Sequence, residues 1–369
     1  MPQAAATTLA GEIVGSSALT VWSLPSAERL RRQLRRAGAT ADSGPKRHLL
    51  LRADWVYDEV LVKSLARRDT DSALVGGNGE CVAVNVAAER VAEARSLLAQ
   101  GQSAQGLERL DAATLAGNYN DALRKREPPF LLPLTEQSQR DIEARVFQGS
   151  YKGVTDFVTL YLWPRPARAF TGWCARLGIT PNMVTSLSLV CVLLSMWCFW
   201  HGHYGWGLLS AWFMTFLDTV DGKLARVTLQ SSPWGDVYDH SIDLIHPPFW
   251  WWAWVVGLTA VGLPLANASL VLWVIIGGYV LQRVEEGLFI TWFKMDMHVW
   301  QRFDSKLRLV TARRNPNLAI LTVAVLLGRP DTGIEIVAWW VAICLALHAL
   351  RLVQAAVARR QGPLRSWLS

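Results

Sequence analysis

The distribution of apolar residues changes near residue 150. Before that point the chain is polar and rich in arginine, and no apolar run is long enough to cross a bilayer. The remainder contains long apolar runs, which predict six membrane spans at about 181–201, 205–227, 236–258, 267–291, 316–329 and 333–356. A span needs roughly 20 residues at a rise of ~1.5 Å each, so the fifth run is short for a crossing. The pattern predicts a mainly α-helical membrane protein with a six-helix transmembrane bundle.

Short alternating elements fill the N-terminal part. Helices are predicted at 25–37, 58–67 and 87–99, and a buried strand at 48–53. The segments SALVG and CVAVNV flank the turn GGNG and are typical of a strand pair. This alternation predicts a small cytoplasmic α/β domain over residues 1–123.

The stretch between this domain and the first span differs in composition. Residues 124–150 include RKREPPFLLPL, whose basic residues and prolines predict a linker onto the membrane surface. Residues 151–178 combine aromatic and basic residues with Pro164 and Pro166, which predicts an interfacial arm that lies along the bilayer and is broken near the prolines. The six-span domain then covers 179–358, and 359–369 form a cytoplasmic tail.

Charge sets the expected orientation. Lys and Arg residues cluster in 294–314 and in the C-terminal tail, whereas the connections at 202–204, 259–266 and 330–332 contain neither. The positive-inside rule therefore predicts cytoplasmic termini, in a multi-pass protein of the plasma membrane. No signal-peptide pattern opens the sequence, which agrees with a cytoplasmic N-terminal domain. Because the basic residues lie beside spans, the net charge of +7 favours anionic lipid as a partner and argues against nucleic acid.

Two further features fall inside the predicted spans. An aromatic cluster, Phe249, Trp250, Trp251, Trp252 and Trp254, is expected to contact lipid or the membrane interface. Arg283 and Glu286 lie three residues apart in the fourth span and are expected to pair. The alternative is that Arg283, like Arg313 and Arg314, faces the phosphate of a substrate.

The stretch 218–243 carries the strongest chemical signal. Asp218 and Asp221 are three residues apart, and Asp239 and Asp243 are four apart, so each pair projects from one face of a helix. Carboxylates at short range repel one another unless cations neutralise them. An all-oxygen cluster suits Mg²⁺ or Mn²⁺, with room for two ions among four acids.

Small residues accompany these acids. Gly222 and Ala225 leave one side of the first helix bare, and Gly235 does the same one turn before Asp239. A Gly inside a helix costs about 1 kcal/mol relative to Ala, so its presence beside the acids indicates that space is needed there. Arg226 adds a fixed cation suited to a phosphate.

These residues match a family pattern. The arrangement D-x-x-D-G-x-x-A-R, eight residues, then G-x-x-x-D-x-x-x-D resembles the signature of the CDP-alcohol phosphotransferases. The resemblance implies that an acceptor hydroxyl attacks the β-phosphorus of a CDP-alcohol and that CMP leaves. It also implies roles for the matching positions: metal binding by Asp218, Asp221, Asp239 and Asp243, catalysis by Asp243 as general base and by Arg226, and nucleotide binding by Gly222, Ala225 and Gly235. Asn182 and Thr185, in the run P-N-x-x-T, are candidates for the same nucleotide site.

The resemblance leaves the substrates open. CDP-diacylglycerol is the favoured donor, a soluble CDP-polyol such as CDP-inositol is the alternative, and the acceptor is a polyol or polyol phosphate. Members of the family resemble homodimers, so a homodimer is expected. Two alternative functions outside the transferase class are a cation-coupled transporter and an inactive membrane scaffold.

The N-terminal domain has a resemblance of its own. The segment LLLRADWVYD resembles a strand-end motif of sugar nucleotidyltransferases, in which Asp54 would help to hold a metal. A fusion of such a domain to the membrane domain is similar to bifunctional enzymes that make CDP-inositol and then use it. Residues 10–25 lack the glycine-rich loop that binds the nucleotide phosphates, so we expect a degenerate domain with a structural or regulatory role.

Overall fold

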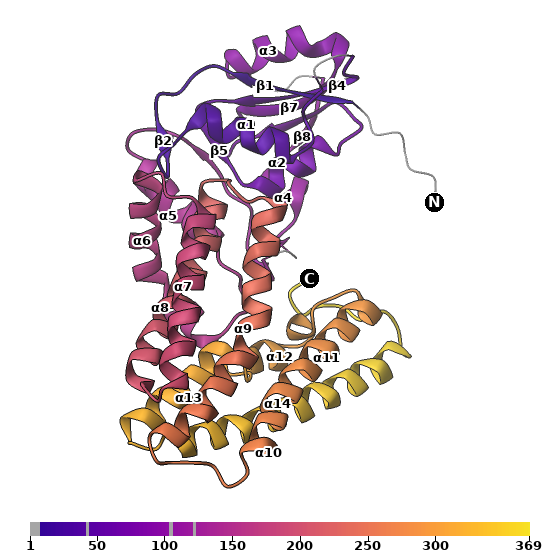
Figure 1. Cartoon of the computed structure of the whole chain (residues 1–369). Helices are drawn as coiled ribbons and strands as arrows, with labels where there is room; N and C mark the ends of the chain where they lie inside the picture. Colours follow the sequence, from indigo (N-terminus) through magenta and orange to yellow (C-terminus); the bar gives the residue numbers. More distant parts are fainter. Residues whose placement is uncertain (1–7, 42–43, 103–105, 121–122) are drawn as a thin grey trace. The chain divides into compact units, whose positions relative to one another are not determined.

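The computed structural model describes residues 8–41, 44–102, 106–120 and 123–369. The chain divides into two compact units (Figure 1). Unit 1 comprises Met1–Tyr151 with Arg226–Leu229, and unit 2 comprises Lys152–Ala225 with Gln230–Ser369.

Unit 1 is built on a mixed five-stranded sheet. Its strands, in spatial order, are β1 (Leu9–Val14), β4 (Arg47–Arg52), β7 (Cys81–Ala87), β6 (Ser72–Val75) and β8 (Glu108–Leu110). The two outer pairs, β1 with β4 and β6 with β8, are parallel, and the inner pairings are antiparallel. The helices are α1 (Ser26–Arg36), α2 (Glu59–Ala66), η1 (Ala88–Arg90), α3 (Val91–Ala99), α4 (Ala112–Ala116) and α5 (Gln139–Gly149).

The sheet is buried on both faces. Successive side chains of a strand point to opposite faces, so Leu49 and Leu51 join one core cluster and Leu50 joins another. Leu30 of α1 and Leu61 of α2 belong to the first cluster. Residues of α3 belong to the second. This three-layer packing explains why the strand HLLLR is a continuous apolar run instead of an alternating one.

The structure confirms most of the elements predicted for unit 1. Helices α1, α2 and α3 and strands β4, β6 and β7 lie within a few residues of the predicted ranges. Gly38, directly after the predicted end of the first helix, has a φ of 82°, a conformation that favours glycine. Strand β1 was not predicted.

Short strands complete unit 1, and some of them fall in the predicted linker. They are β2 (Thr20–Val21), β3 (Leu24–Pro25), β5 (Trp55–Tyr57), β9 (Tyr119–Asn120), β10 (Lys125–Arg126) and β11 (Leu131–Pro133). Strand β11 pairs with β5, and α5 follows it within the same unit. Residues 124–150 thus form ordered elements of unit 1 and not an open linker.

Unit 2 is helical throughout the elements assigned to it. They are η2 (Val158–Leu162, a π-helix), α6 (Pro164–Arg176), α7 (Pro181–Trp200), α8 (Tyr204–Val227), α9 (Pro233–Ala260), α10 (Ala268–Leu272), η3 (Trp273–Gly277), α11 (Gly278–Phe293), η4 (Met297–Val299), α12 (Arg302–Arg308), α13 (Arg314–Leu326) and α14 (Pro330–Arg359). Pro164 occupies the first turn of α6, where its missing N–H costs nothing. The preceding helix η2 ends at Leu162, so the helical stretch is interrupted beside the prolines, as predicted.

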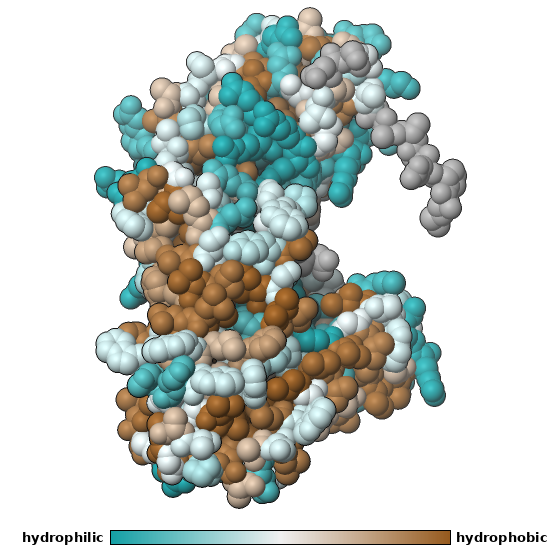
Figure 2. Space-filling model, viewed as in Figure 1, coloured by the Kyte–Doolittle hydropathy of each residue, from teal (hydrophilic) through white to brown (hydrophobic). Residues whose placement is uncertain are grey.

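Among the residues that the structure describes, three helical stretches are long and apolar enough to cross a membrane: Pro181–Trp200, Ala268–Phe293 and Pro330–Arg359. Figure 2 shows apolar side chains gathered over unit 2, whereas unit 1 is mostly polar on the face in view. These features mark a membrane protein. Helices also cover the other three predicted spans, but α13 has only 13 residues, or about 20 Å, which is short for a crossing. The six-span bundle stays a prediction.

The aromatic cluster of α9 has a different role from the one expected. Trp250, Trp251 and Trp254 are at most 2% exposed, so the predicted lipid contact is wrong for them. The indole of Trp250 donates to the Val192 carbonyl over 3.0 Å. These rings pack in the interior because α7 and α9 approach closely: a Cβ built on Gly257 would lie 1.9 Å from the Phe199 carbonyl oxygen. Large aromatic side chains thus form part of the helix-packing core.

Candidate metal and phosphate site

The acids of α8 and α9 converge within unit 2. One carboxylate oxygen from each of Asp218, Asp221 and Asp239 lies within 4.8 Å of the other two. Asp221 is buried, and Asp218 and Asp239 are partly buried. The helical spacing of three residues places Asp218 and Asp221 on one face of α8, as the sequence predicted. A buried cluster of three carboxylates is costly without a cation, and its oxygen donors fit Mg²⁺ or Mn²⁺.

Asp243 lies one turn beyond Asp239 on α9 and is bound differently. Its Oδ1 accepts a hydrogen bond of 2.5 Å from Nη1 of Arg314, the first residue of α13. The same guanidinium donates to Asp218 through Nη2. A single planar cation therefore joins the acids of two helices, which a fork of fixed N–H donors does well.

Thr185 orients one of the acids. Its hydroxyl lies 2.7 Å from Oδ2 of Asp221 and 3.1 Å from the Pro181 carbonyl, in the first turns of α7. The shorter of the two contacts is the one to the Asp221 carboxyl oxygen. The backbone N–H of Gly222 also donates to Asp221, over 2.5 Å. Asp221 is thus held by two donors outside the acid cluster.

Asn182 and Gly235 meet at the start of α9. A Cβ on Gly235 would lie 2.7 Å from Oδ1 of Asn182 and 3.1 Å from Oγ of Ser232, so only glycine fits without a shift. The Ser232 hydroxyl caps α9 by accepting from the Gly235 N–H. The structure therefore brings Asn182 and Thr185 to the same region as the motif.

The remaining motif residues stand on the last turns of α8. Ala225 is partly buried, and Arg226 lies in the final turn of the helix, in the segment that clusters with unit 1. Their assignment to the nucleotide and to catalysis stays a prediction.

Residues just before α6 fix the segment that carries Arg314. Asn315 donates a 2.8 Å hydrogen bond to Oδ1 of Asp156, whose oxygens also accept from the backbone N–H and the hydroxyl of Thr159. Burial by itself raises the pKa of Asp156, but the hydrogen bonds from Asn315 and Thr159 outweigh it and the pKa lies below its ordinary value. No local pattern distinguishes Asn315, because only the fold brings it beside Asp156.

Arg283 and Arg313 belong to a separate cluster. Arg283 donates to Oε1 of Glu286 over 3.0 Å, which confirms the predicted pairing. Arg313 donates to the same oxygen. Of the three arginines considered for a substrate phosphate, Arg314 is the one in contact with the motif acids.

The fold and the motif agree with the comparison to known families. Residues 178–304 match the model of the CDP-alcohol phosphatidyltransferase family. This stretch contains α7 to α9 with all four aspartates, so the matched region and the motif coincide. The resemblance predicted from the motif is confirmed.

Particular relatives can be named. The chain is 31% identical over 77 residues to a phosphatidylinositol phosphate synthase of Streptomyces avermitilis, which covers 21% of this chain and 32% of that protein. It is 29% identical over 123 residues to choline/ethanolaminephosphotransferase 1 of Arabidopsis thaliana, covering 28% of this chain and 29% of that protein. Choline/ethanolaminephosphotransferase 2 of the same plant is 31% identical over 105 residues, 24% of each chain. The matches span less than a third of each relative.

Proposed function

We propose that unit 2 transfers a phospho-alcohol group from a CDP-alcohol donor to an acceptor hydroxyl and releases CMP. The convergence of Asp218, Asp221 and Asp239 supports this most strongly, because three carboxylates from two helices lie close enough to share one divalent cation. The match to the family model supports it independently.

The motif acids are proposed to hold Mg²⁺ or Mn²⁺, with Asp218, Asp221 and Asp239 as the principal ligands and Asp243 available to a second ion. When bound, the metal neutralises charge on the diphosphate of the donor and on the departing CMP. Thr185 keeps an oxygen of Asp221 fixed, and the bare surface at Gly222, Ala225 and Gly235 gives the nucleotide room. Arg226, Asn182 and Thr185 are proposed to line the nucleotide side of the site.

Asp243 is proposed as the general base. The acceptor oxygen forms a bond to the β-phosphorus, the bond from that phosphorus to the CMP oxygen breaks, and the acceptor proton moves to Asp243. Arg314 binds Oδ1 of Asp243, which leaves the second oxygen to take the proton. Since the guanidinium stays charged at any physiological pH, it holds Oδ1 of Asp243 in a fixed position.

The apolar helices of unit 2 favour CDP-diacylglycerol as the donor, because its acyl chains stay in the bilayer. A soluble CDP-polyol such as CDP-inositol is the alternative. The named relatives act on different alcohols, as their names state, so the acceptor is left to assay. A panel of donors and acceptors, offered to the purified full chain in liposomes with Mg²⁺, tests the proposal by CMP release. A transporter or an inactive scaffold would release no CMP with any pair.

We also propose that the active site and both termini face the cytoplasm of a plasma-membrane protein, on the charge distribution alone. Thiol labelling from each side of sealed vesicles, with a cysteine placed in the C-terminal tail, tests this orientation. The protein is further proposed to be a homodimer, which cross-linking in native membranes tests.

Unit 1 is proposed to be a degenerate nucleotidyltransferase-like domain. Asp54, the candidate metal residue, forms a 2.5 Å ion pair with Arg52, which also pairs with Glu80. This pairing supports a structural use of Asp54. The full chain can be assayed for pyrophosphate release from CTP and polyol phosphates. Release that is lost in Asp54→Asn would instead indicate an active nucleotidyltransferase domain.

A further inference from the structure

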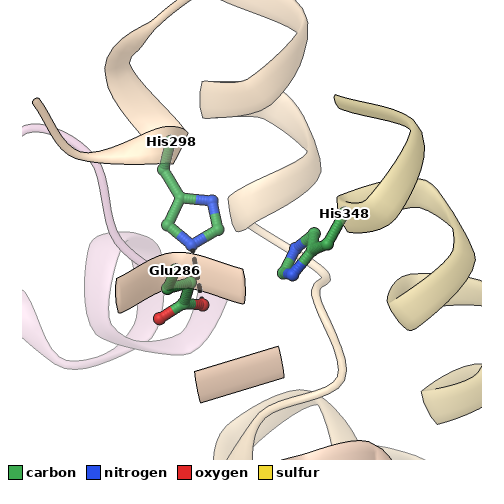
Figure 3. A group of neighbouring side chains, drawn as sticks. All are labelled: Glu286, His298 and His348. Atoms are coloured by element: carbon green, nitrogen blue, oxygen red, sulfur yellow. Dashed lines mark hydrogen bonds and ion pairs between the residues drawn. The ribbon is translucent and has the colours of Figure 1, made fainter. Parts of the chain in front are cut away.

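A second cluster of metal-type side chains lies in unit 2, apart from the four aspartates. It consists of Glu286 on α11, His298 on η4 and His348 on α14, and one ligand atom of each lies within 4.8 Å of the others. Figure 3 shows the two imidazoles and the carboxylate turned toward a common space. Nε2 of His298 lies 3.2 Å from Oε1 of Glu286, and the two imidazole centroids are 5.5 Å apart. We propose that this cluster binds a transition-metal ion of the zinc class.

The unpartnered atoms around this space point to a ligand. The side chain of His348 is 1% exposed, yet neither of its ring nitrogens has a hydrogen-bond partner among the described residues. Oε2 of Glu285 is also buried and, within the same part of the chain, unpartnered. Buried polar atoms almost always have partners, so three orphaned atoms side by side indicate a group that binds between them.

The position of Glu285 suggests how His348 is oriented. Its Oε2 lies 3.9 Å from Nδ1 of His348. Metal-binding histidines generally direct the second ring N–H to a carboxylate or carbonyl. With Nδ1 directed to Glu285, Nε2 of His348 is the nitrogen left for the ion, together with Nε2 of His298 and a carboxylate oxygen of Glu286.

The donor set selects the kind of ion. Two imidazoles and one carboxylate are typical of zinc and neighbouring transition metals, whereas Mg²⁺ prefers oxygen ligands alone. Three protein ligands also leave a position for water or another group. The cluster therefore differs in ion preference from the aspartate site, and its assignment does not depend on the proposed transferase activity.

Two arginines already contact the proposed ligands. Arg283 and Arg313 both donate to Oε1 of Glu286, so a bound ion would share this carboxylate with two cations. Nη2 of Arg313 also lies 3.4 Å from Nε2 of His298, the atom that the ion needs. Binding therefore requires Arg313 to withdraw from His298. Arg313 directly precedes Arg314, which binds Asp243. Displacement of Arg313 by the ion is therefore expected to shift Arg314 as well.

The test uses the purified full chain in detergent, stripped of metal and then exposed to Co²⁺ in excess Mg²⁺, which keeps the aspartate site occupied. Cobalt bound by imidazole has a visible absorption spectrum, and elemental analysis after gel filtration gives its stoichiometry. We expect one Co²⁺ per chain, displaced by Zn²⁺, in the wild type and in the matched control His203→Ala. In His348→Ala and in His298→Asn the affinity should fall by at least about tenfold.

Absence of stoichiometric cobalt in the wild type would overturn the proposal, as would unchanged binding in both folded variants. Gel-filtration profiles and unfolding midpoints show whether each variant is folded. If His348→Ala fails to fold, Glu286→Gln takes its place. Cobalt binding is measured without any substrate, so its failure is distinguishable from a failure to release CMP.

Discussion

Arg314 donates a 2.5 Å hydrogen bond to Asp243, and the other arm of its guanidinium reaches Asp218. This residue of α13 thereby ties the acids of α8 and α9 to a third helix. The family motif contains the acids and not the arginine, so the contact extends the site beyond the motif D-x-x-D-G-x-x-A-R. It also supplies the charge that a cluster of carboxylates needs when no other cation is near.

Replacing Asp243 tests its proposed role as general base. Asp243→Asn should lower the rate of CMP release by about 10²–10⁴-fold, because the amide accepts no proton from the acceptor. Binding of the CDP-alcohol, measured by equilibrium dialysis, should persist. Asp236→Asn changes an exposed acid of the same helix and should leave the rate unchanged. A fully active Asp243→Asn variant would contradict the assignment.

Replacing Arg314 tests whether it substitutes for metal charge. Arg314→Ala leaves Asp218 and Asp243 without their common cation, so the unfolding midpoint in EDTA should fall. Excess Mg²⁺ should raise the unfolding midpoint of the variant by more than it raises that of the wild type, because the ion then supplies the positive charge that Arg314 provided. Differential scanning fluorimetry in EDTA and in Mg²⁺ measures both. Equal Mg²⁺ effects on the two proteins would show that Arg314 and the metal act independently.

Thr185 should control metal affinity through Asp221. Thr185→Val keeps the shape of the side chain and removes the hydroxyl that contacts Oδ2, so the Mg²⁺ concentration for half-maximal CMP release should rise by about 10–100-fold. Thr185→Ser retains the hydroxyl and serves as the matched variant. If Ser and Val behave alike, the hydrogen bond is not what matters at this position.

Gly235 should not accept even one added methyl group. In Gly235→Ala the new Cβ would lie 2.7 Å from Oδ1 of Asn182, so α7 and α9 have to move apart or Asn182 has to turn away. We expect a loss of activity larger than the loss of thermal stability. Gly205→Ala is the control, since a Cβ there meets nothing within 4 Å. Wild-type kinetics for Gly235→Ala would show that this close contact is dispensable.

Asp156 should make stability depend on pH in the acid range. Its pKa in the folded protein lies below the ordinary value of 3.8, so its contribution is present above that value and is lost as the pH falls through the folded-state pKa. Unfolding midpoints should therefore drop below about pH 4 in the wild type and less steeply in Asp156→Asn. Parallel pH profiles for the two proteins would mean that another acid dominates.

The sequence predicted the acid cluster because helical spacing alone places Asp218 beside Asp221, and the family pattern added their counterparts on α9. It also predicted the pairing of Arg283 with Glu286, which depends on a separation of three residues. Both relationships are local within helices. The helices of unit 1 were predictable for the same reason, as their apolar periodicity is visible in short windows.

Contacts between segments that lie far apart in the sequence could not be predicted. Arg314 meets Asp218 across 96 positions, and Asn315 meets Asp156 across 159. The burial of Trp250 also depends on how closely α7 and α9 pack, which Gly257 permits but no hydropathy pattern reports. Residues 124–150 were mistaken for a linker because proline and basic residues suit both a linker and a short edge strand, and pairing with β5 decides between them.

The most direct test of the central claim is the Mg²⁺ dependence of CMP release by the purified chain, compared with Asp221→Asn and Asp239→Asn. The account predicts release that EDTA abolishes and Mg²⁺ restores, with both variants, one on each helix, inactive or active only at far higher Mg²⁺. Release that persists in EDTA, or a wild-type Mg²⁺ requirement in either variant, would contradict a metal site shared by α8 and α9.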